Sequence, residues 1–462
     1  MKLYNTLIRR LDKFKPIKKN KIGIYSCGPT VYWNQHIGHM YAYTQWDSLI
    51  KFFRYLGYKT KWVMNITDVG HMTSDEDIGE DKMEKGARRE GISVWDIAKK
   101  YIDQFTESMQ LLNIQKPDVL CRATEHIKEQ IKLAQKIEAN GFTYKTETGL
   151  VFDTTKFPAY ANFAKLDLTK QEAGIRVEID PEKKKPWDFL LWVTNQPKHI
   201  MQWSSPWGKG FPGWHLECTA MSTKYLGEQF DIHTGGMEHI PVHHTNEIAQ
   251  AFGAFGRQTA NYWIHNEWLT VKGQKMSKST GNFYTVQDLR DKGYNPLSLR
   301  YLILTSHYRK GLDFTFESLD GAQTALNNLI NNIKAWKKQS PSLSDNVKNK
   351  SWQNKFINAL SNNLNWPQAM AIVWQLIKSN LPESEKLSLL LDWDKVLGLD
   401  LDKAASERNK EEIPPKIEDL KKKREQLRKQ RKFDAADEIR KQVNAEGFVF
   451  QDTTSGTAIF KK

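Results

Sequence analysis

Two short strings of residues carry groups suited to holding a chain of phosphates. The first is His36-Ile37-Gly38-His39, and the second, far along the chain, is Lys275-Met276-Ser277-Lys278-Ser279. A chain of phosphates concentrates negative charge on its oxygen atoms, so a site that holds it needs hydrogen-bond donors and cations. His36 and His39 could donate from a strand-to-helix turn, and Gly38 would let a nucleotide approach a helix N-terminus. Lys275 and Lys278 would meet the β- and γ-phosphates from a glycine-flanked loop.

A second constellation has the residue types of a metal shell. Cys27 precedes the first string, Cys218 ends the stretch Gly213-Trp214-His215-Leu216-Glu217-Cys218, and His243 and Glu247 are four residues apart. On a helix, residues four apart face the same side. Two thiolates, an imidazole and a carboxylate could bind zinc. Taken alone, two distant cysteines are more often small buried apolar residues, and the sequence leaves both interpretations open.

The elements that must position these groups are readable from periodicity. Residues 21–25 form a short apolar run typical of a buried strand. Residues 39–56 have apolar and aromatic side chains at helical spacing, and Gly57 is placed to end that helix in a left-handed conformation. Residues 61–66 again indicate a strand. Strand, helix and strand in this order predict a βαβ unit, and hence an α/β fold of the Rossmann type with a doubly wound parallel sheet.

The remainder of the chain divides into further segments. The irregular residues 117–202 predict an insertion between two halves of the sheet, and strands are expected again at 230–233 and 261–265. After residue 316 the pattern is helical. Two prolines, Pro414 and Pro415, follow a polar stretch that we interpret as a linker. Residues 417–443 are basic and helical in pattern, with an interruption near 432–434, and residues 448–460 suggest a hairpin.

Composition narrows the kind of protein. The chain has 462 residues, a net charge of +14 and three cysteines, namely Cys27, Cys121 and Cys218. The positive charge favours an acidic partner such as the phosphate backbone of RNA. Three cysteines cannot form a closed disulfide set, which indicates a reducing cytosol. The sequence shows no run of about 18–20 apolar residues and no secretory segment at its start, so neither membrane insertion nor export is expected.

The two strings, in this order and behind a βαβ unit, resemble the ATP-binding signatures of class I aminoacyl-tRNA synthetases. The extension Cys27-Gly28-Pro29-Thr30-Val31-Tyr32 before the first string is similar to that of the cysteine-specific family. This resemblance, which runs from about Leu3 to Thr457, implies ATP-dependent activation of L-cysteine to cysteinyl-adenylate and transfer to the 3′ end of tRNA(Cys). It assigns ATP, with Mg²⁺, to His36, Gly38, His39, Lys275 and Lys278.

The resemblance also implies one zinc ion on Cys27, Cys218, His243 and Glu247, and a cysteine pocket containing Thr67, Trp214 and His233. Zinc would select the substrate thiolate where an apolar pocket could not separate near-isosteric side chains. The chain departs from the family pattern at Glu238, where an aspartate is usual, and at Thr245, where a glutamate is usual. The proposed ligands survive both changes, although hydrogen bonds to them could differ.

Two alternatives share parts of this pattern. A ligase that joins cysteine to an amino sugar has the same activation core but no use for an RNA-binding tail. Here residues 431–440 and 451–457 resemble the synthetase tail, and most of residues 421–432 are Lys or Arg. A catalytically dead relative that only binds RNA is the other alternative, and intact His36, His39, Lys275 and Lys278 argue against it. The resemblance implies a cytoplasmic monomer, because members of the family are usually monomers.

The domain organisation that the resemblance implies has six segments. They are the first half of the catalytic domain (1–116), a connective insertion (117–202), the second half (203–270), the loop and stem-contact region (271–316), a helical bundle (317–405) and a C-terminal anticodon-binding domain (406–462).

Overall fold

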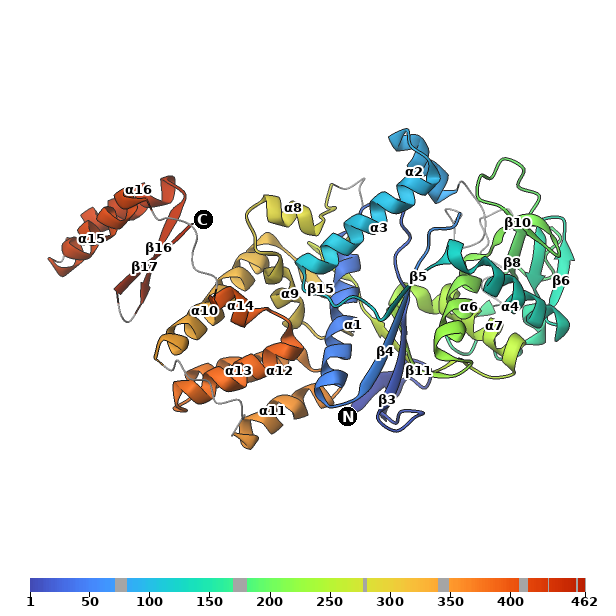
Figure 1. Cartoon of the computed structure of the whole chain (residues 1–462), viewed down its shortest axis with the longest axis horizontal. Coiled ribbons are helices and arrows are strands. Elements are labelled where there is room, and N and C mark those ends of the chain that lie inside the picture. Colours follow the sequence, from blue (N-terminus) through green and yellow to red (C-terminus); the bar gives the residue numbers. More distant parts are fainter. Residues whose placement is uncertain are drawn as a thin grey trace. The chain divides into compact units, whose positions relative to one another are not determined.

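The computed structural model describes residues 1–70, 81–168, 181–276, 281–339, 349–406, 414–430, 432–453 and 456–461 (Figure 1). Two compact units are present. The first comprises Met1–Arg290 and Tyr294–Leu401, and the second Asp291–Gly293 and Asp402–Lys462. Among the described residues, no helix is both long and apolar enough to cross a bilayer.

A five-stranded parallel sheet forms the centre of the first unit. Its strands, in spatial order, are β12 (Ala260–Asn266), β11 (Phe230–Gly236), β3 (Lys21–Ser26), β4 (Lys59–Ile66) and β5 (Val119–Arg122). Helix α1 (Ile37–Tyr55) lies on one side of this sheet, and α6 (Trp214–Leu226) lies on the other with α7 (Thr245–Phe255) beside it (Figure 1). This arrangement confirms the predicted doubly wound α/β fold.

The predicted βαβ unit is present with small shifts at its ends. β3, α1 and β4 contain the expected segments 21–25, 39–56 and 61–66, and Gly57 has a φ of 87° as predicted. Both strands begin with exposed residues and become buried toward their carboxyl ends, because only those ends lie under the covering helices. The predicted strands at 230–233 and 261–265 correspond to β11 and β12.

A second, antiparallel sheet is inserted between β5 and α6. Its strands, in spatial order, are β6 (Thr143–Thr146), β7 (Gly149–Phe152), β8 (Phe189–Thr194), β10 (Gly208–Pro212) and β9 (Trp203–Ser205). Helix α4 (Ile127–Ala139) precedes it. The insertion predicted at 117–202 differs from this sheet at both ends, because β5 pairs with β4, and β9 and β10 follow residue 202. The strands β5, β9 and β10 are three to five residues long, so they show little alternation of apolar and polar residues.

Smaller elements surround the two sheets. They are the hairpin β1 (Lys2–Asn5) and β2 (Arg10–Lys13), helices α2 (Lys82–Glu90), α3 (Val94–Leu111), α8 (Val286–Asp291) and α9 (Pro296–Leu304), and the sheet of β14 (Gln274–Lys275), β13 (Leu269–Val271) and β15 (Leu312–Phe314). The predicted helical region follows, with α10 (Phe316–Gln339), α11 (Lys350–Ser361), α12 (Trp366–Lys378), α13 (Glu383–Leu397) and α14 (Leu401–Ser406).

A buried charged cluster joins α13 to helix α1 of the parallel sheet. Arg300 of α9 is fully buried, and its guanidinium donates to the Asp47 carboxylate of α1 at 2.7 Å and to the Leu397 carbonyl at the end of α13 at 2.6 Å. Lys51, one helical turn after Asp47, donates to the same carboxylate at 2.6 Å. The bundle and the parallel sheet are therefore joined by charge-assisted hydrogen bonds in their shared core.

The second unit has its own small core. Helices α15 (Pro415–Lys429) and α16 (Phe433–Ala445) pack with the hairpin β16 (Phe448–Thr453) and β17 (Gly456–Lys461). Among the described residues, the apolar core includes Ile417, Ile439, Val443, Phe450 and Ile459. The predicted helical break near 432–434 and the predicted hairpin are confirmed. Most of the predicted linker lies outside the described residues.

Candidate active site and metal centre

A cleft of about 480 Å³ opens at the carboxyl ends of β3 and β11. The chain leaves β3 toward β4 and leaves β11 toward β12, so the two connections run in opposite directions. Ligands of doubly wound sheets bind at such a switch point. The cleft is lined by residues of both strings, by Cys27 of the metal constellation and by aromatic side chains, among them His36, Gly38, His39, Lys275, Met276, Trp214 and Trp268.

His36 and His39 cap the first turn of α1 reciprocally. The Nδ1 atom of His36 accepts from the backbone N–H groups of Gly38 at 3.1 Å and His39 at 3.3 Å. The Nδ1 atom of His39 accepts from the backbone N–H of His36 at 3.3 Å, and the two rings stack with centroids 3.7 Å apart. This is a capping box in which two imidazoles replace the usual hydroxyl and carboxylate.

The capping box determines where the imidazole protons reside. Because both Nδ1 atoms accept, a neutral ring carries its proton on Nε2 and can donate from there. Desolvation between the cleft walls, together with neighbouring His36, holds the pKa of His39 well below its usual value. His39 is therefore neutral near pH 7, and its Nε2–H is a donor at a helix N-terminus.

The second string packs against the first. A Cβ on Gly38 would lie 2.6 Å from the Met276 methyl and 2.9 Å from the His36 ring, so a larger residue here would have to displace one of these side chains. Beyond the loop, Phe283 meets the His36 ring edge-on, and the Ile37 N–H donates to the Tyr284 carbonyl at 2.8 Å. Lys275 lines the same cleft, whereas Lys278 lies outside the described residues.

The four residues of the metal constellation meet beside the cleft. Cys27 follows β3, Cys218 is on α6, His243 lies in the π-helical turn Ile240–His244, and Glu247 is on α7. One ligand atom from each side chain lies within 4.8 Å of the others, and all four residues are buried. Residues far apart in sequence are thus brought together by four elements that meet at the carboxyl edge of the sheet.

The charges of this cluster suit a cation. Burial raises the pKa of the Cys27 thiol, whereas hydrogen bonds from Cys27 and His243 outweigh burial at Cys218 and lower its pKa to about 6. At His243 burial alone would lower the pKa, but Cys218 and Glu247 raise it to about 10. His233 and His243 lower the pKa of Glu247 to about 2 against the effect of burial. Two anionic groups, together with a thiol and an imidazole that can each give up a proton, are the ligand set of a soft divalent metal such as Zn²⁺.

A second set of ligands overlaps the first. Cys27 and Glu247 also lie within 4.8 Å of His233 and His244. His244 is already held at both nitrogens, with Nε2 3.2 Å from the Cys27 sulfur and Nδ1 2.7 Å from His265 Nε2. The set with two thiols matches the preference of zinc for sulfur more closely.

His215 orients the candidate ligand His243, and the sequence analysis missed it. The Nδ1 atoms of the two rings are 2.9 Å apart, and His215 is buried. A signal existed in the sequence, since His215 and Cys218 are three residues apart on one helix and therefore share a face. Metal-ligating histidines commonly depend on such a partner at their other nitrogen.

Of the three residues predicted for the cysteine pocket, only Trp214 lines the cleft. Its ring packs on His243 at a centroid distance of 4.3 Å. Thr67 is buried and donates to Glu217 at 2.8 Å, and His233 is buried with its Nε2 2.9 Å from Glu247. Thr67 and His233 thus reach the site through carboxylates rather than through the cleft surface.

The two departures from the family pattern have structural partners. Glu238 accepts from the Trp268 indole N–H at 2.8 Å, and both side chains line the cleft. Thr245 donates to the Ile240 carbonyl at 2.7 Å and so fastens the turn that carries His243. Trp268 is a cleft residue that sequence reasoning missed, because nothing in the string around it distinguishes it from a packing aromatic residue.

Comparison with known proteins places this site in a family. Residues 13–324 match the family described as tRNA synthetases class I (C) catalytic domain. The cysteine–tRNA ligase of Treponema denticola is 42% identical, covering 100% of this chain and 99% of that protein. Cysteine–tRNA ligase 1 of Burkholderia lata is 44% identical, covering 99% and 96%. The chain belongs to the cysteine–tRNA ligase family. A more distant family member, from Thermus thermophilus, is 37% identical and covers 98% of each chain.

The fold of this family member is shared with a differently named synthetase. Methionyl-tRNA synthetase of Mycobacterium tuberculosis, in complex with methionyl-adenylate, is 14% identical with a TM-score of 0.58. The match covers 83% of this chain and 93% of the other. The likeness concerns the fold alone.

Proposed function

We propose that the chain activates L-cysteine with ATP to cysteinyl-adenylate and transfers the cysteinyl group to the 3′ end of tRNA(Cys). The observation that carries this proposal is the position of a buried Cys–Cys–His–Glu cluster beside a cleft capped by the His36–His39 pair. The histidine pair, which would bind phosphate, and the metal cluster, which would select the thiol, could then both contact one bound adenylate. Family membership over the whole length of the chain supports the same reaction.

Cys27, Cys218, His243 and Glu247 are the residues we propose to hold zinc, because their donor set fits that metal. When bound, zinc supplies a soft ligand site that prefers a substrate thiolate to a hydroxyl. Trp214 would provide an apolar wall for the substrate side chain. Thr67 and His233 would act through Glu217 and Glu247, by keeping these carboxylates in place.

The first string would act on ATP. As the cysteine carboxylate attacks the α-phosphate and pyrophosphate leaves, negative charge accumulates on the phosphate oxygens. The Nε2–H groups of His36 and His39 and the N-terminus of α1 would donate to these oxygens beside Gly38. Lys275, Lys278 and Mg²⁺ would neutralise the β- and γ-phosphates.

The second unit would bind tRNA. Its basic helix α15 presents lysines on a small independent core, as expected for contacts with phosphates. We propose that residues 271–316, which include the second string, contact the acceptor stem of tRNA. Residues 317–405 would form a tRNA-contacting bundle, and residues 406–462 would bind the anticodon. The scarcity of cysteine supports a cytosolic reaction, and we propose a monomer.

Charging of total tRNA with labelled cysteine tests the proposal, with cysteine-dependent ATP–pyrophosphate exchange beside it and serine as competitor. We expect both activities with cysteine and neither with serine. Exchange without charging of tRNA would favour the amino-sugar ligase, for which glucosamine-type acceptors are the direct assay. Absence of exchange with zinc-loaded protein would favour a non-catalytic RNA-binding relative.

A further inference from the structure

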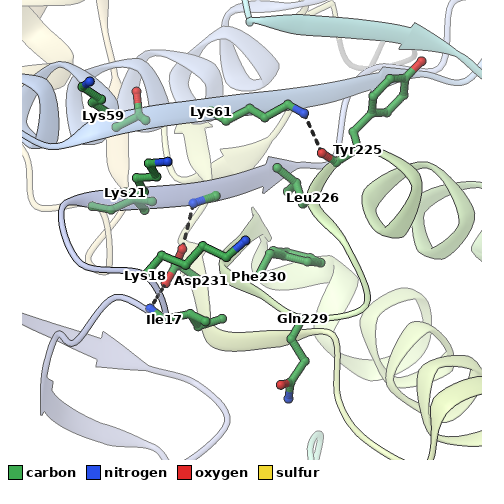
Figure 2. A pocket seen from close by; sticks show the side chains of 13 residues that line it. Ile17, Lys18, Lys21, Lys59, Lys61, Tyr225, Leu226, Gln229, Phe230 and Asp231 are labelled. Carbon is green, nitrogen blue, oxygen red and sulfur yellow. Dashed lines mark hydrogen bonds between the residues drawn. The ribbon is translucent and has the colours of Figure 1, made fainter.

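A second cavity, of about 360 Å³, lies at the amino end of the parallel sheet (Figure 2). The starts of β3, β4 and β11 form it together with the loop before β3 and the end of α6. The same three strands lead to the catalytic cleft at their carboxyl ends. At about 3.3 Å per residue, a strand of six to eight residues separates the two cavities by roughly 20 Å.

Four exposed lysines surround this cavity, and three of them stand on one face of the sheet. Lys21 and Lys59 are direct cross-strand partners in the β3–β4 ladder. Lys61 follows Lys59 by two residues and therefore points to the same side, and Lys18 lies in the preceding loop (Figure 2). Like charges placed directly opposite each other destabilise a sheet. The fold gains nothing from this arrangement, which suits an anion between the ammonium groups.

Asp231 lies close enough to Lys18 to attract its ammonium group, but the other three lysines have no carboxylate partner among the described residues. The Asp231 carboxylate accepts from the backbone N–H groups of Ile17 at 2.7 Å and Gly23 at 2.8 Å, and thereby holds the loop in place. Lys61 donates to the Tyr225 carbonyl at 2.6 Å, which leaves its charge uncompensated. Across the described ranges, no carboxylate forms an ion pair with Lys21 or Lys59.

The wall of the cavity is apolar. Phe230 and Ile22 are buried beneath it, and Leu226 and the ring of Tyr225 stand at its side (Figure 2). The Tyr225 hydroxyl is fixed by a 2.8 Å hydrogen bond with His126, so this ring has a defined position. A cavity that combines an apolar wall with clustered cations suits a ligand that has a flat apolar part and several negative charges.

We propose that this cavity is a binding site for a nucleoside polyphosphate, separate from the catalytic cleft. The polyphosphate would lie between Lys18, Lys21, Lys59 and Lys61, and the base would pack against Tyr225 and Leu226. The cavity volume falls in the range of small-molecule sites. A strand of RNA would be expected to follow an extended basic groove, whereas these lysines line a single open cavity. The proposal does not depend on the reaction assigned to the cleft.

Equilibrium dialysis with labelled ATP tests this site on the full-length protein. The variant Lys21→Gln/Lys59→Gln removes the cross-strand charges, and Lys128→Gln/Lys132→Gln removes the same charge from the exposed face of α4 as a matched control. We expect two ATP molecules per chain in the wild type and the control, and at least tenfold weaker binding of one of them in the first variant. A His36→Ala/His39→Ala variant should lose the other ATP.

Each other outcome has a defined meaning. Equal ATP binding by the Lys21/Lys59 variant and its control would overturn the proposal. Displacement of ATP by tripolyphosphate as strongly as by unlabelled ATP would overturn the role of the nucleoside. Binding of an oligouridine that depends on Lys21 and Lys59, without such dependence for ATP, would replace the nucleotide by RNA. Loss of a single ATP only in the histidine variant would leave the cleft as the sole site and overturn the proposal.

Discussion

The two cysteines of the candidate metal centre have opposite acid strengths although both are buried. The pKa of Cys27 is raised by burial, and that of Cys218 is lowered to about 6 by its hydrogen bonds with Cys27 and His243. Cys218 is therefore the more acidic thiol of the two. A hydroxyl in its place would neither carry a negative charge nor bind a soft metal well.

Replacing Cys218 by serine should remove bound zinc and raise the KM for cysteine at least tenfold, because one of two sulfur ligands is lost. Metal content measured by mass spectrometry and the exchange assay check this. Cys121→Ser is the matched control, since the Cys121 thiol only donates to the Met64 carbonyl at 3.4 Å. Full zinc content in the Cys218 variant would show that this residue is not a ligand.

The two overlapping ligand sets differ in which histidine they use. His243→Gln should lower zinc content severely, whereas His244→Gln should retain zinc, because His244 is engaged with His265 and lies outside the two-thiol set. Cobalt substitution followed by visible spectroscopy reports both ligand loss and geometry. The opposite result, with metal lost only in the His244 variant, would select the alternative set.

His36 combines a structural and a chemical role that substitution can separate. Asparagine is a good N-cap, so His36→Asn should keep stability within about 1 kcal/mol of wild type while lowering the exchange rate by about 10²–10³, because the Nε2–H donor is lost. His36→Ala should lose both the cap and the donor. Thermal unfolding and exchange rates together check this, and normal exchange by the asparagine variant would limit His36 to capping.

Candidate site residues could be named from the sequence where the chemistry requires a contiguous string. Which of them line the cleft could not be predicted. The two strings and the four metal candidates could be named, and the structure brings the four together. Thr67 and His233 lie behind the cleft, and Trp268 and His215 were missed, because burial and cross-strand contacts depend on packing between distant segments. The roles of all these residues stay predictions.

At the scale of elements, the buried cluster of Asp47, Lys51 and Arg300 decides how α1 is held. The carboxylate of Asp47 accepts from both cations and also from the Gln115 backbone N–H at 2.9 Å. The exposed fractions are 0% for Asp47 and Arg300 and 9% for Lys51. Removing Asp47 takes away the carboxylate bonded to both cations and leaves only the nearby Asp394 to act on them, whereas removing Lys51 leaves the Asp47–Arg300 pair intact.

Asp47→Asn should lower the free energy of unfolding by about 3–5 kcal/mol, the usual cost of an uncompensated buried charge. Lys51→Met should change it by only about 1–2 kcal/mol at pH 7, the scale of one charged hydrogen bond. Urea unfolding monitored by tryptophan fluorescence compares them. Similar losses in the two variants would contradict the central role assigned to the carboxylate.

The pH dependence of Lys51 has a definite sign. Burial and neighbouring Arg300 lower the pKa of Lys51 in the folded protein from 10.5 to about 8. Between these values the unfolded chain binds a proton that the folded chain has lost, so the free energy of unfolding rises with pH. Unfolding curves should therefore show that the free energy of unfolding of the wild type rises relative to that of Lys51→Met between pH 8 and 10.5. The rise should be at most about 1.4 kcal/mol per pH unit. A constant difference would contradict the lowered pKa.

Long elements with strong periodicity were predictable, and short ones were not. The βαβ unit around α1 and the interrupted helix pair of the second unit follow from apolar spacing and terminal glycine. β5, β9 and β10 are assigned by pairing partners elsewhere in the chain, which a local pattern does not contain. The sequence therefore predicted the main sheet correctly but not where the second sheet begins and ends.

At the scale of the whole molecule, the basic run of the second unit is less uniform than its sequence suggests. Arg424 is only 1% exposed, and it donates to the Thr457 hydroxyl at 3.0 Å, so it belongs to the core of the unit. Lys422, Lys423 and Lys429 are exposed. These lysines, rather than the whole run, are the candidates for contacts with RNA.

Lys422→Ala/Lys423→Ala/Lys429→Ala should raise the KM for tRNA, because about one phosphate contact is lost with each lysine. The slope of log affinity against log salt should become shallower by about 2–3. Filter binding at several salt concentrations measures this, and unchanged pyrophosphate exchange is the internal control. An unchanged salt slope would assign these lysines to a solvated surface.

The buried Arg300 has a mechanical consequence. Helix α1 begins at the His36 cap in the catalytic cleft, and the same helix is bonded through Asp47 to the end of α13 in the bundle. Helix α1 therefore sets a fixed distance between the cleft and the bundle. Under the proposed function, an RNA that contacts both would have to match the distance that this helix sets between them.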